Sequence, residues 1–513
     1  MRVLVIGMDG ATPQLLFPWA EEGKLPNIAE LIEEGVSGNL RSTIPPTTAP
    51  AWVSFMTGKR PGNHGVFDFV RRKFGSYETT KFGGRSEIEE KAGIDLSVIS
   101  EVAIHSKKIW EILSEHGKRV GVMHVPITYP PRKVNGFLIS GLGTPSPESE
   151  FTYPRELKKK ILSMGYKIHI TELDVEGNED AALRDLRETE EKRCEVAIEL
   201  VEEYNPEFFC IVFESTDFIQ HFFWKYCDPE HHAHDPRKAK KYGNAILSCY
   251  QLLDRLIGKL IENFDPDTVI IMSDHGGGPL RKIFYINRWL LNQGLLRLRE
   301  KKTKSIMLNL GLNQDNFKRI ITKLGLKPVV KRIPRKIRQK VPEAFTLSDI
   351  DWSETKAYSV GGWGFIYLNL KGREPEGTIS QEEYDLVRNE IIDKLYRLKD
   401  PDTGDSVVKK VYKKEELYGG EMMDLFPDLV IIPEESIDFK HSIPGRDSVL
   451  VPAPPEKSGN HRMDGIFIMK GKNVRKNEKI RNAEIIDVAP TVLHVMGVPV
   501  PPDMDGKVLD VFS

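Results

Sequence analysis

Four short apolar runs, which alternate along the chain with helix-like segments, constrain the fold of this 513-residue chain most strongly. They cover residues 2–7, 119–125, 207–213 and 268–272. Short apolar runs of this kind are typical of strands that are buried on both faces. Their alternation with amphipathic segments favours a mainly parallel sheet with helices on both faces. We therefore predict an α/β fold.

We expect one domain spanning residues 1–513, with three inserted segments. Residues 71–100 are charged and show little periodicity, and they could form a flap over a site or a long surface excursion. Residues 151–200 leave the alternation of strands and helices, which indicates a cap-like insertion. Residues 297–345 are strongly basic and are predicted to form a helical insertion.

The basic insertion has a local charge that the chain as a whole lacks. Residues 297–340 contain fifteen lysines and arginines against two acidic residues, whereas the net charge of the chain is −2. Such a segment could bind an anionic substrate, a nucleic acid or a membrane surface. Nucleic acid is not favoured, because aromatic side chains for base stacking are nearly absent, and a solvated helical insertion is preferred.

Several features of the sequence indicate the cellular compartment of the protein and the kind of organism it comes from. No apolar stretch approaches the roughly 18 residues of a membrane span, and the start lacks the features of a signal peptide. The four cysteines are scattered without a CxxC spacing, which favours a reducing cytoplasm. Abundant lysine and glutamate indicate a thermophilic source.

Three aspartates follow predicted strands within a few residues: Asp9, Asp217 and Asp274. One such aspartate commonly caps the next helix. In a parallel α/β sheet, however, the carboxyl ends of the strands meet at one edge, where ligands bind. We therefore expect these three carboxylates to lie close together.

Three histidines accompany the aspartates. His221 follows Asp217 by four residues, which places both on one face of a helix. His275 follows Asp274 directly, and His461 lies in a turn-like stretch before a strand. Mixed nitrogen and oxygen ligands suit divalent zinc or manganese. We predict that Asp217, His221 and His461 bind one ion, and that Asp9, Asp274 and His275 bind another.

A pair of hydroxyls, Thr47 and Thr48, precedes an apolar helix-like segment at residues 51–56. On its own, such a hydroxyl is best interpreted as a helix cap. The start of a helix also attracts anions, so a hydroxyl there can attack a phosphate. A nearby metal ion would lower its pKa, as the pKa of bound water falls from about 15.7 toward 7.

These motifs together resemble the alkaline phosphatase superfamily, particularly its type I phosphodiesterase and nucleotide pyrophosphatase branch. They occur in the order of the family over nearly the whole chain: MDG at 8–10, TAPAWVSFMTGKRPGNHGV at 48–66, STDFIQHFF at 215–223, SDHG at 273–276, GNHR at 459–462 and IIDVAPTVLHVMGVP at 485–499. The resemblance implies an alkaline-phosphatase-like core and a metal-dependent hydrolase of phosphate esters. The substrate would be a small phosphate ester or a nucleotide.

The resemblance also assigns roles to residues. Thr48 is the nucleophile and, with Asp9, Asp274 and His275, binds one metal. Asp217, His221 and His461 bind the other, and the two ions are zinc, with manganese as the alternative.

One position departs from the family pattern. Diesterases of this branch often have an asparagine shortly after the HG pair, where it helps to hold a phosphoryl oxygen, and Phe69 stands there in this chain. A preference for diesters over monoesters is therefore left open. Four cations could hold the phosphoryl group instead: Lys59, Arg60, Arg71 and Arg72.

His64, in the same segment, is expected to brace the nucleophile helix rather than to bind metal.

Two alternative functions are kept: a phosphotransferase or mutase on the same scaffold, and a non-enzymatic protein that binds anions or nucleic acid through the basic insertion. A sulfatase is disfavoured, because the nucleophile segment has no cysteine.

Overall fold

The structure is a computed structural model that describes residues 1–72, 75–77, 79–81, 104, 106–172, 175–299, 347–444 and 448–513. Residues 82–100 of the expected flap and residues 300–345 of the basic insertion lie outside this part of the chain. In the described part, no helix is both long enough and apolar enough to cross a membrane.

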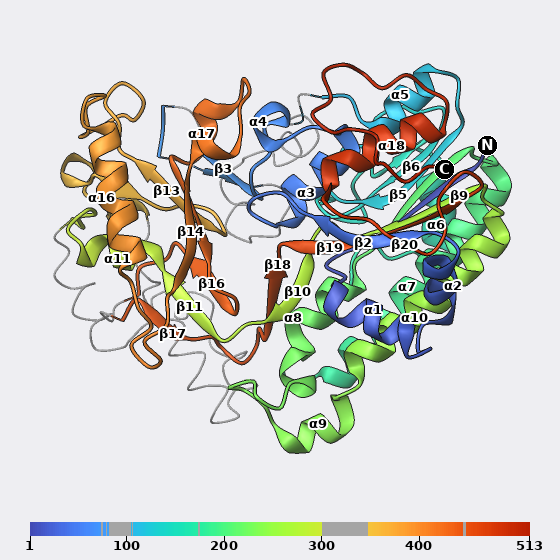
Figure 1. Ribbon diagram of the computed structural model, residues 1–513, viewed down its shortest axis with the longest axis horizontal. Helices are drawn as coiled ribbons and strands as arrows, with labels where there is room; N and C mark the ends of the chain where they lie inside the picture. Colours follow the sequence, from blue (N-terminus) through green and yellow to red (C-terminus); the bar gives the residue numbers. More distant parts are fainter. Residues whose placement is uncertain are drawn as a thin grey trace.

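A ten-stranded sheet forms the centre of the main lobe (Figure 1). The order is β20-β2-β19-β9-β1-β8-β5-β6-β7, with β21 beside β2. The five strands from β9 to β6 are parallel, whereas β19 and β7 are antiparallel to their neighbours. The strands are β1 (Val3–Met8), β2 (Val36–Arg41), β5 (Val120–Val125), β6 (Gly136–Ser140), β7 (Thr152–Tyr153), β8 (Phe208–Phe213), β9 (Thr268–Met272), β19 (Asp464–Gly471), β20 (Glu478–Lys479) and β21 (Ala483–Glu484). The predicted α/β class is confirmed.

The apolar runs exist because the sheet is covered on both faces. Successive residues of a strand point to opposite faces, so Val3 and Val5 of β1 enter one core, whereas Leu4 and Ile6 enter the other. The first core includes α3 (Thr48–Thr57), α5 (Ile109–Glu115) and α18 (Val488–Val495). The second includes α1 (Pro13–Glu21), α2 (Pro26–Glu33), α7 (Glu179–Tyr204), α8 (Ser215–Cys227) and α10 (Ala245–Phe264).

Helix α7 changes the extent of the expected 151–200 insertion. It packs against α10 in the core of the main lobe, so the residues from Glu179 onward are part of that core. The preceding residues form the short strand β7 and the helix α6 (Leu157–Ser163) at the edge of the sheet.

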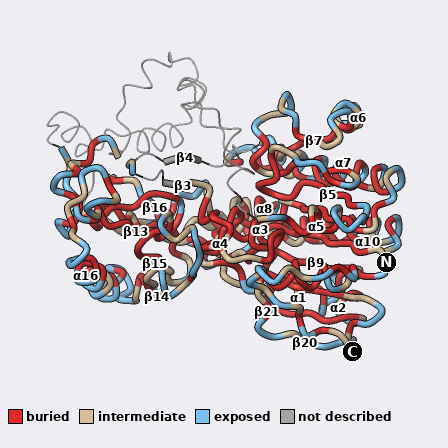
Figure 2. Tube along the Cα trace, turned by 90° about the horizontal axis from the view of Figure 1, so that it is seen from above, coloured by how far each residue is buried: buried red, intermediate tan, exposed pale blue. Residues whose placement is uncertain are grey.

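The described residues between 282 and 452 build a second lobe with a core of its own, which no local sequence pattern predicts. It lies on the left in Figure 1, and Figure 2 shows buried segments running through both lobes. Its sheets have the orders β12-β13-β15-β14 and β16-β11-β17. Its elements include β11 (Lys282–Tyr285), α11 (Ile286–Asn292), β12 (Ala357–Tyr358), β13 (Gly364–Leu368), α16 (Tyr384–Tyr396), β14 (Val408–Lys413), α17 (Lys414–Leu417), β15 (Leu429–Pro433), β16 (Ile437–Lys440) and β17 (Leu450–Pro452).

Asp68 joins the two lobes. Its buried carboxylate accepts a 2.7 Å hydrogen bond from the backbone N–H of Gly362, in the second lobe. It also accepts a 2.7 Å bond from the N–H of Phe69. Gly361, beside this contact, has a φ of +98°, and a Cβ there would collide with Asp68, so this position requires glycine.

Asp68→Asn is expected to remove a pH dependence of stability. Burial raises the pKa of Asp68 to about 6, although the bonds from Gly362 and Phe69 lower it. The folded protein therefore holds this proton more tightly than the unfolded chain, and the free energy of unfolding falls as pH rises from about 4 to about 6. We expect wild type to lose on the order of 2–3 kcal/mol relative to the variant over this range. Urea unfolding of both proteins at pH 4 and pH 7.5 measures the difference, and parallel pH profiles would contradict the expectation.

Candidate active site

The predicted ligands meet at the carboxyl ends of three adjacent strands. Asp9 follows β1, and Asp274 and His275 follow β9. Asp217 lies in the first turn of α8, which begins shortly after β8. His461 arrives from far along the chain, because its strand β18 (Gly459–Arg462) pairs antiparallel with β10 (Gly276–Pro279), the strand that directly follows His275.

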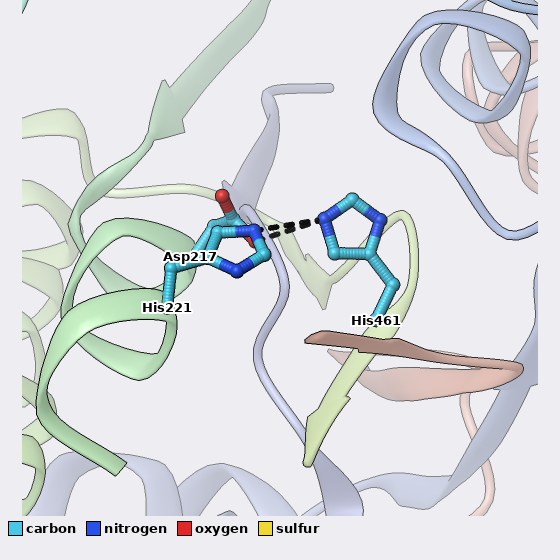
Figure 3. A group of neighbouring side chains, drawn as sticks. All are labelled: Asp217, His221 and His461. Carbon is cyan, nitrogen blue, oxygen red and sulfur yellow. Dashed lines mark hydrogen bonds and ion pairs between the residues drawn. The ribbon is translucent and has the colours of Figure 1, made fainter. Parts of the chain in front are cut away.

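Asp217, His221 and His461 form one group of candidate metal ligands (Figure 3). Oδ1 of Asp217 lies 3.2 Å from Nε2 of His221 and 3.4 Å from Nε2 of His461. The two Nε2 atoms are 3.0 Å apart. One ligand atom from each residue lies within 4.8 Å of the other two, so a single ion could bind all three.

Backbone carbonyls determine which histidine nitrogens face the site. Nδ1 lies 2.8 Å from the Gly459 oxygen in His221 and 3.0 Å from the Pro46 oxygen in His461. A carbonyl oxygen only accepts, so Nδ1 carries a proton in each ring and Nε2 is the nitrogen that faces the site. Two Nε2 atoms that face each other at 3.0 Å require a cation or a proton between them. This arrangement, with each Nδ1–H held by a carbonyl, is the one seen in metal-binding histidines.

Asp9, Asp274 and His275 form the second group, which is buried. Oδ2 of Asp9 accepts a 2.9 Å bond from Nε1 of Trp52, and Oδ1 of Asp274 accepts a 3.1 Å bond from the N–H of Gly10. The other oxygen of each carboxylate is buried and finds no donor among the described residues. Burying such an oxygen without a partner is costly, so the pair fits a bound cation.

His275 completes this group. Its Nε2 lies 3.2 Å from the unpaired Oδ2 of Asp274 and 3.8 Å from the unpaired Oδ1 of Asp9. Its Nδ1 lies 3.0 Å from the carbonyl oxygen of Gly276, which again leaves the Nε2 lone pair toward the carboxylates.

The electrostatics of the two groups differ. Burial raises the pKa of Asp9, and the charges of Asp274 and Asp217 raise it further. Burial likewise raises the pKa of Asp274 to about 7. Burial would also raise the pKa of Asp217, but the contacts with His221 and His461 bring it well below its ordinary value. Three carboxyl groups thus lie close together at the strand ends, and a divalent cation would offset the negative charge that they carry when ionised.

Thr48 is the first residue of α3, and its buried hydroxyl faces the second group. Its Oγ1 lies 3.3 Å from Nε2 of His275. Thr47 is the residue before the helix, and its side chain makes no capping hydrogen bond. Thr48 is the first helical residue and not the N-cap residue, so capping does not account for its hydroxyl, which lies at a helix N-terminus next to His275.

The residues that follow α3 in sequence, and the histidine expected to brace it, have different surroundings. His64 is buried, with Nε2 2.9 Å from Oγ of Ser54 in α3, as expected for a brace. Lys59 pairs with Asp503 at 2.6 Å and Arg60 with Glu484 at 2.6 Å, so both bind the C-terminal part of the chain. The structure brings neither cation to the metal-ligand groups.

Arg71 and Arg72 belong to β3 (Val70–Arg72), and the structure does not describe their side chains. The role of the four cations in holding the phosphoryl group stays a prediction.

Sequence reasoning missed three residues around the site. Trp52 bonds to Asp9, and Oγ1 of Thr216 donates a 2.6 Å bond to the Asp9 carbonyl. The ring of Trp363, from the second lobe, lies 5.9 Å from the ring of His461. Trp52 follows Thr48 by four residues and so shares its helix face, which could have indicated it. No local signal places Trp363.

The comparison with protein families agrees with this geometry. The family model for type I phosphodiesterase / nucleotide pyrophosphatase matches residues 3–465, a range that includes every predicted metal ligand. The chain belongs to this family. It is thus a member of the alkaline phosphatase superfamily and a hydrolase that acts on phosphoric ester bonds.

Solved structures of similar fold include two kinds of enzyme. Murine ectonucleotide pyrophosphatase / phosphodiesterase 5, inactive and in complex with AMP, has a TM-score of 0.55 and 14% identity, with 100% of both chains covered. Phosphonoacetate hydrolase from Sinorhizobium meliloti 1021 in complex with phosphonoformate has a TM-score of 0.55 and 14% identity, covering 95% of this chain and 94% of that one. At such identities the likeness shows the fold alone. No curated protein sequence matched this phosphodiesterase-family chain.

Proposed function

We propose that this enzyme cleaves phosphate esters with Thr48 as nucleophile and two bound divalent metal ions. One observation carries the proposal: Oγ1 of Thr48 lies at a helix N-terminus, 3.3 Å from Nε2 of His275, and that same nitrogen lies 3.2 Å and 3.8 Å from the unpaired oxygens of Asp274 and Asp9. A hydroxyl so placed can be activated by a cation, and its surroundings suit an anionic phosphoryl group.

The donor sets determine which ions fit. Asp217, His221 and His461 would hold one ion, and Thr48 with Asp9, Asp274 and His275 would hold the other. Mixed imidazole and carboxylate ligands suit zinc, with manganese as the alternative. When bound, the ions supply positive charge to the phosphoryl oxygens and lower the pKa of nearby hydroxyls.

The residues of the chain then act in two steps. The Thr48 oxygen attacks phosphorus as its hydroxyl loses a proton, and the bond from phosphorus to the ester oxygen breaks, so that the leaving oxygen takes up a proton and departs as the alcohol. Water then attacks the phospho-threonine: the bond from phosphorus to the Thr48 oxygen breaks, one proton of the water returns to that oxygen, and phosphate, or a phosphate monoester when the substrate is a diester, is released. The free N–H groups and the dipole of α3 favour the negative charge of the phosphoryl group throughout.

We infer that the substrate is a small phosphate ester or a nucleotide. The similar structures hold AMP and phosphonoformate, both of which carry a phosphoryl or phosphonyl group. The resemblance puts the position of the family asparagine at about Phe69, whose side chain cannot hydrogen-bond a phosphoryl oxygen. Preference for monoesters or diesters therefore has to be measured.

Removal of metal is expected to abolish activity and lower the melting temperature. Stripping the protein with a chelator leaves one oxygen of Asp9 and one oxygen of Asp274 buried without a donor among the described residues. A metal ion at 100 times its dissociation constant then restores stability by about 2.7 kcal/mol per site. The test is to add zinc, manganese, magnesium or calcium to stripped protein and to assay a monoester and a diester side by side. Full turnover by metal-free protein would refute the proposal, and the monoester-to-diester ratio would give the substrate class.

We also infer a cytoplasmic location. The four cysteines are free thiols, and three of them are buried: Cys194, Cys210 and Cys249. Free thiols without disulfides suit a reducing compartment. Recovery of the native protein in a secreted fraction would contradict this.

A further inference from the structure

Tyr418, from the second lobe, holds the segment that leads into the nucleophile helix. It directly follows α17, and its hydroxyl contacts the backbone of Ile44 twice. The N–H of Ile44 donates to the Tyr418 oxygen at 2.7 Å, and the Tyr418 hydroxyl donates to the Ile44 carbonyl at 3.0 Å. The side chain is 8% exposed, and burial raises its pKa, so the hydroxyl keeps the proton that it donates.

The segment held in this way carries two parts of the site. Pro46, two residues after Ile44, provides the carbonyl that fixes Nδ1 of His461 at 3.0 Å. Thr48, two residues further, is the first residue of α3. The segment is compact, because the N–H of Thr47 bonds back to the Pro45 carbonyl at 3.0 Å. A shift of Ile44 would therefore move both the support of His461 and the hydroxyl of Thr48.

The same part of the second lobe also contacts the chain beyond the other end of α3. The N–H of Met422 donates a 3.1 Å bond to the carbonyl of Gly62, in the short helix α4 (Pro61–His64). A Cβ at Gly62 would collide with the backbone of Gly419, so the two backbones touch. Residues 418–422 thus contact the chain on both sides of α3, at Ile44 before the helix and at Gly62 after it.

We propose that Tyr418 is a positioning residue, which orients His461 and Thr48 from the second lobe through the backbone of Ile44. The proposal rests on the function proposed above for these two residues. The role is assigned to the Tyr418 hydroxyl and not to the packing of its ring. The ring alone would hold the two lobes together, but without the hydroxyl it would not fix the backbone of Ile44. Loss of the hydroxyl should therefore weaken metal binding and slow turnover in a folded protein.

A nearby tyrosine provides a matched control. A cleft of about 310 Å³ lies beside the contact of Tyr418 with Ile44 and is lined by both Tyr418 and Tyr412. Tyr412 lies in β14, and its ring packs under the ammonium group of Lys410 at 4.5 Å. Its hydroxyl makes no hydrogen bond to residues 43–48 among the described contacts. Tyr412→Phe therefore removes a hydroxyl from the same cleft and leaves the hydrogen bonds between Tyr418 and Ile44 intact.

The experiment compares Tyr418→Phe, Tyr412→Phe and wild type, each stripped and then titrated with zinc, with kcat and KM measured on the same monoester. We expect Tyr418→Phe to bind one zinc ion about 10-fold to 100-fold more weakly, as changes to groups that orient metal ligands do. Its kcat should fall by about 10-fold or more, because small displacements of reacting groups slow turnover. Tyr412→Phe should match wild type in both. Circular dichroism and thermal unfolding establish that each variant is folded.

The outcomes separate the two proposals. If wild type binds two zinc ions and Tyr418→Phe matches it in zinc affinity and kcat, the positioning role is wrong, even if the melting temperature falls. If stripped wild type binds no zinc or retains full activity, the proposed function itself fails, and the role of Tyr418 fails with it.

Discussion

Thr48→Ala is expected to reduce kcat/KM for phosphate esters by a factor on the order of 10³ to 10⁶, the range seen when a covalent nucleophile is removed. The variant loses the oxygen that would bond to phosphorus, whereas the carboxylates and imidazoles of both ligand groups remain. Zinc binding should therefore persist at the group of Asp217, His221 and His461. Thr48→Ser keeps a hydroxyl at the same helix position and should keep most of the activity.

The helix itself offers a control for this experiment. Thr57 is the last residue of α3, and its hydroxyl donates a 2.6 Å bond to the Val53 carbonyl within the same helix. Thr57→Ala makes the same chemical change away from the ligand groups, so it should change stability but not kcat. Mass spectrometry of acid-quenched enzyme should detect a phosphoryl group on Thr48 in wild type. Wild-type turnover by Thr48→Ala, with no phosphoryl group trapped, would exclude the covalent mechanism.

The strands could be predicted because burial on both faces leaves a simple pattern. In β1, every residue from Val3 to Met8 is buried, so the run is apolar throughout and can be identified as a buried strand from its sequence. The convergence of Asp9, Asp217 and Asp274 followed from one rule, that parallel strands end at a common edge. These predictions depend on short-range patterns and a general topology.

Other features depend on long-range pairing that no local pattern records. Strand β19 inserts antiparallel between β2 and β9, and nothing in its apolar sequence specifies these neighbours. Tyr418 and Trp363 reach the site because the second lobe docks there, which depends on contacts such as Asp68 with Gly362.

Lys59 and Arg60 show the converse difficulty. They follow the nucleophile helix closely in sequence, which made them candidates for phosphate binding. Gly58, however, ends α3 with a φ of +65°, and the chain then turns toward the C-terminal residues Asp503 and Glu484. Proximity in sequence did not predict which surface these cations face.

Asp274→Asn is expected to change stability and function in opposite directions. In metal-free protein at pH 8, Asp274 is a buried carboxylate close to Asp9, and burial raises its pKa to about 7 against an ordinary value of 3.8. The folded pKa is the higher one, so the cost of ionising Asp274 grows as pH rises from about 4 to about 7 and is fully present at pH 8. The amide removes this charge and can still accept the bond from Gly10, so the metal-free variant should be more stable by on the order of a few kcal/mol.

The same substitution removes a charged ligand that the second metal ion would need. Zinc should then raise the melting temperature of Asp274→Asn much less than that of wild type, and kcat/KM should fall by about a thousandfold or more, as when a catalytic group is removed. Asp254→Asn provides the contrast, because Asp254 is equally buried but its oxygens accept 2.9 Å bonds from Ile28 and Asn27. Neutralising that satisfied carboxylate should destabilise the protein and leave the zinc response unchanged. If Asp274→Asn instead destabilises the metal-free protein as Asp254→Asn does, the carboxylate of Asp274 has a structural partner, and the second group is not a metal site.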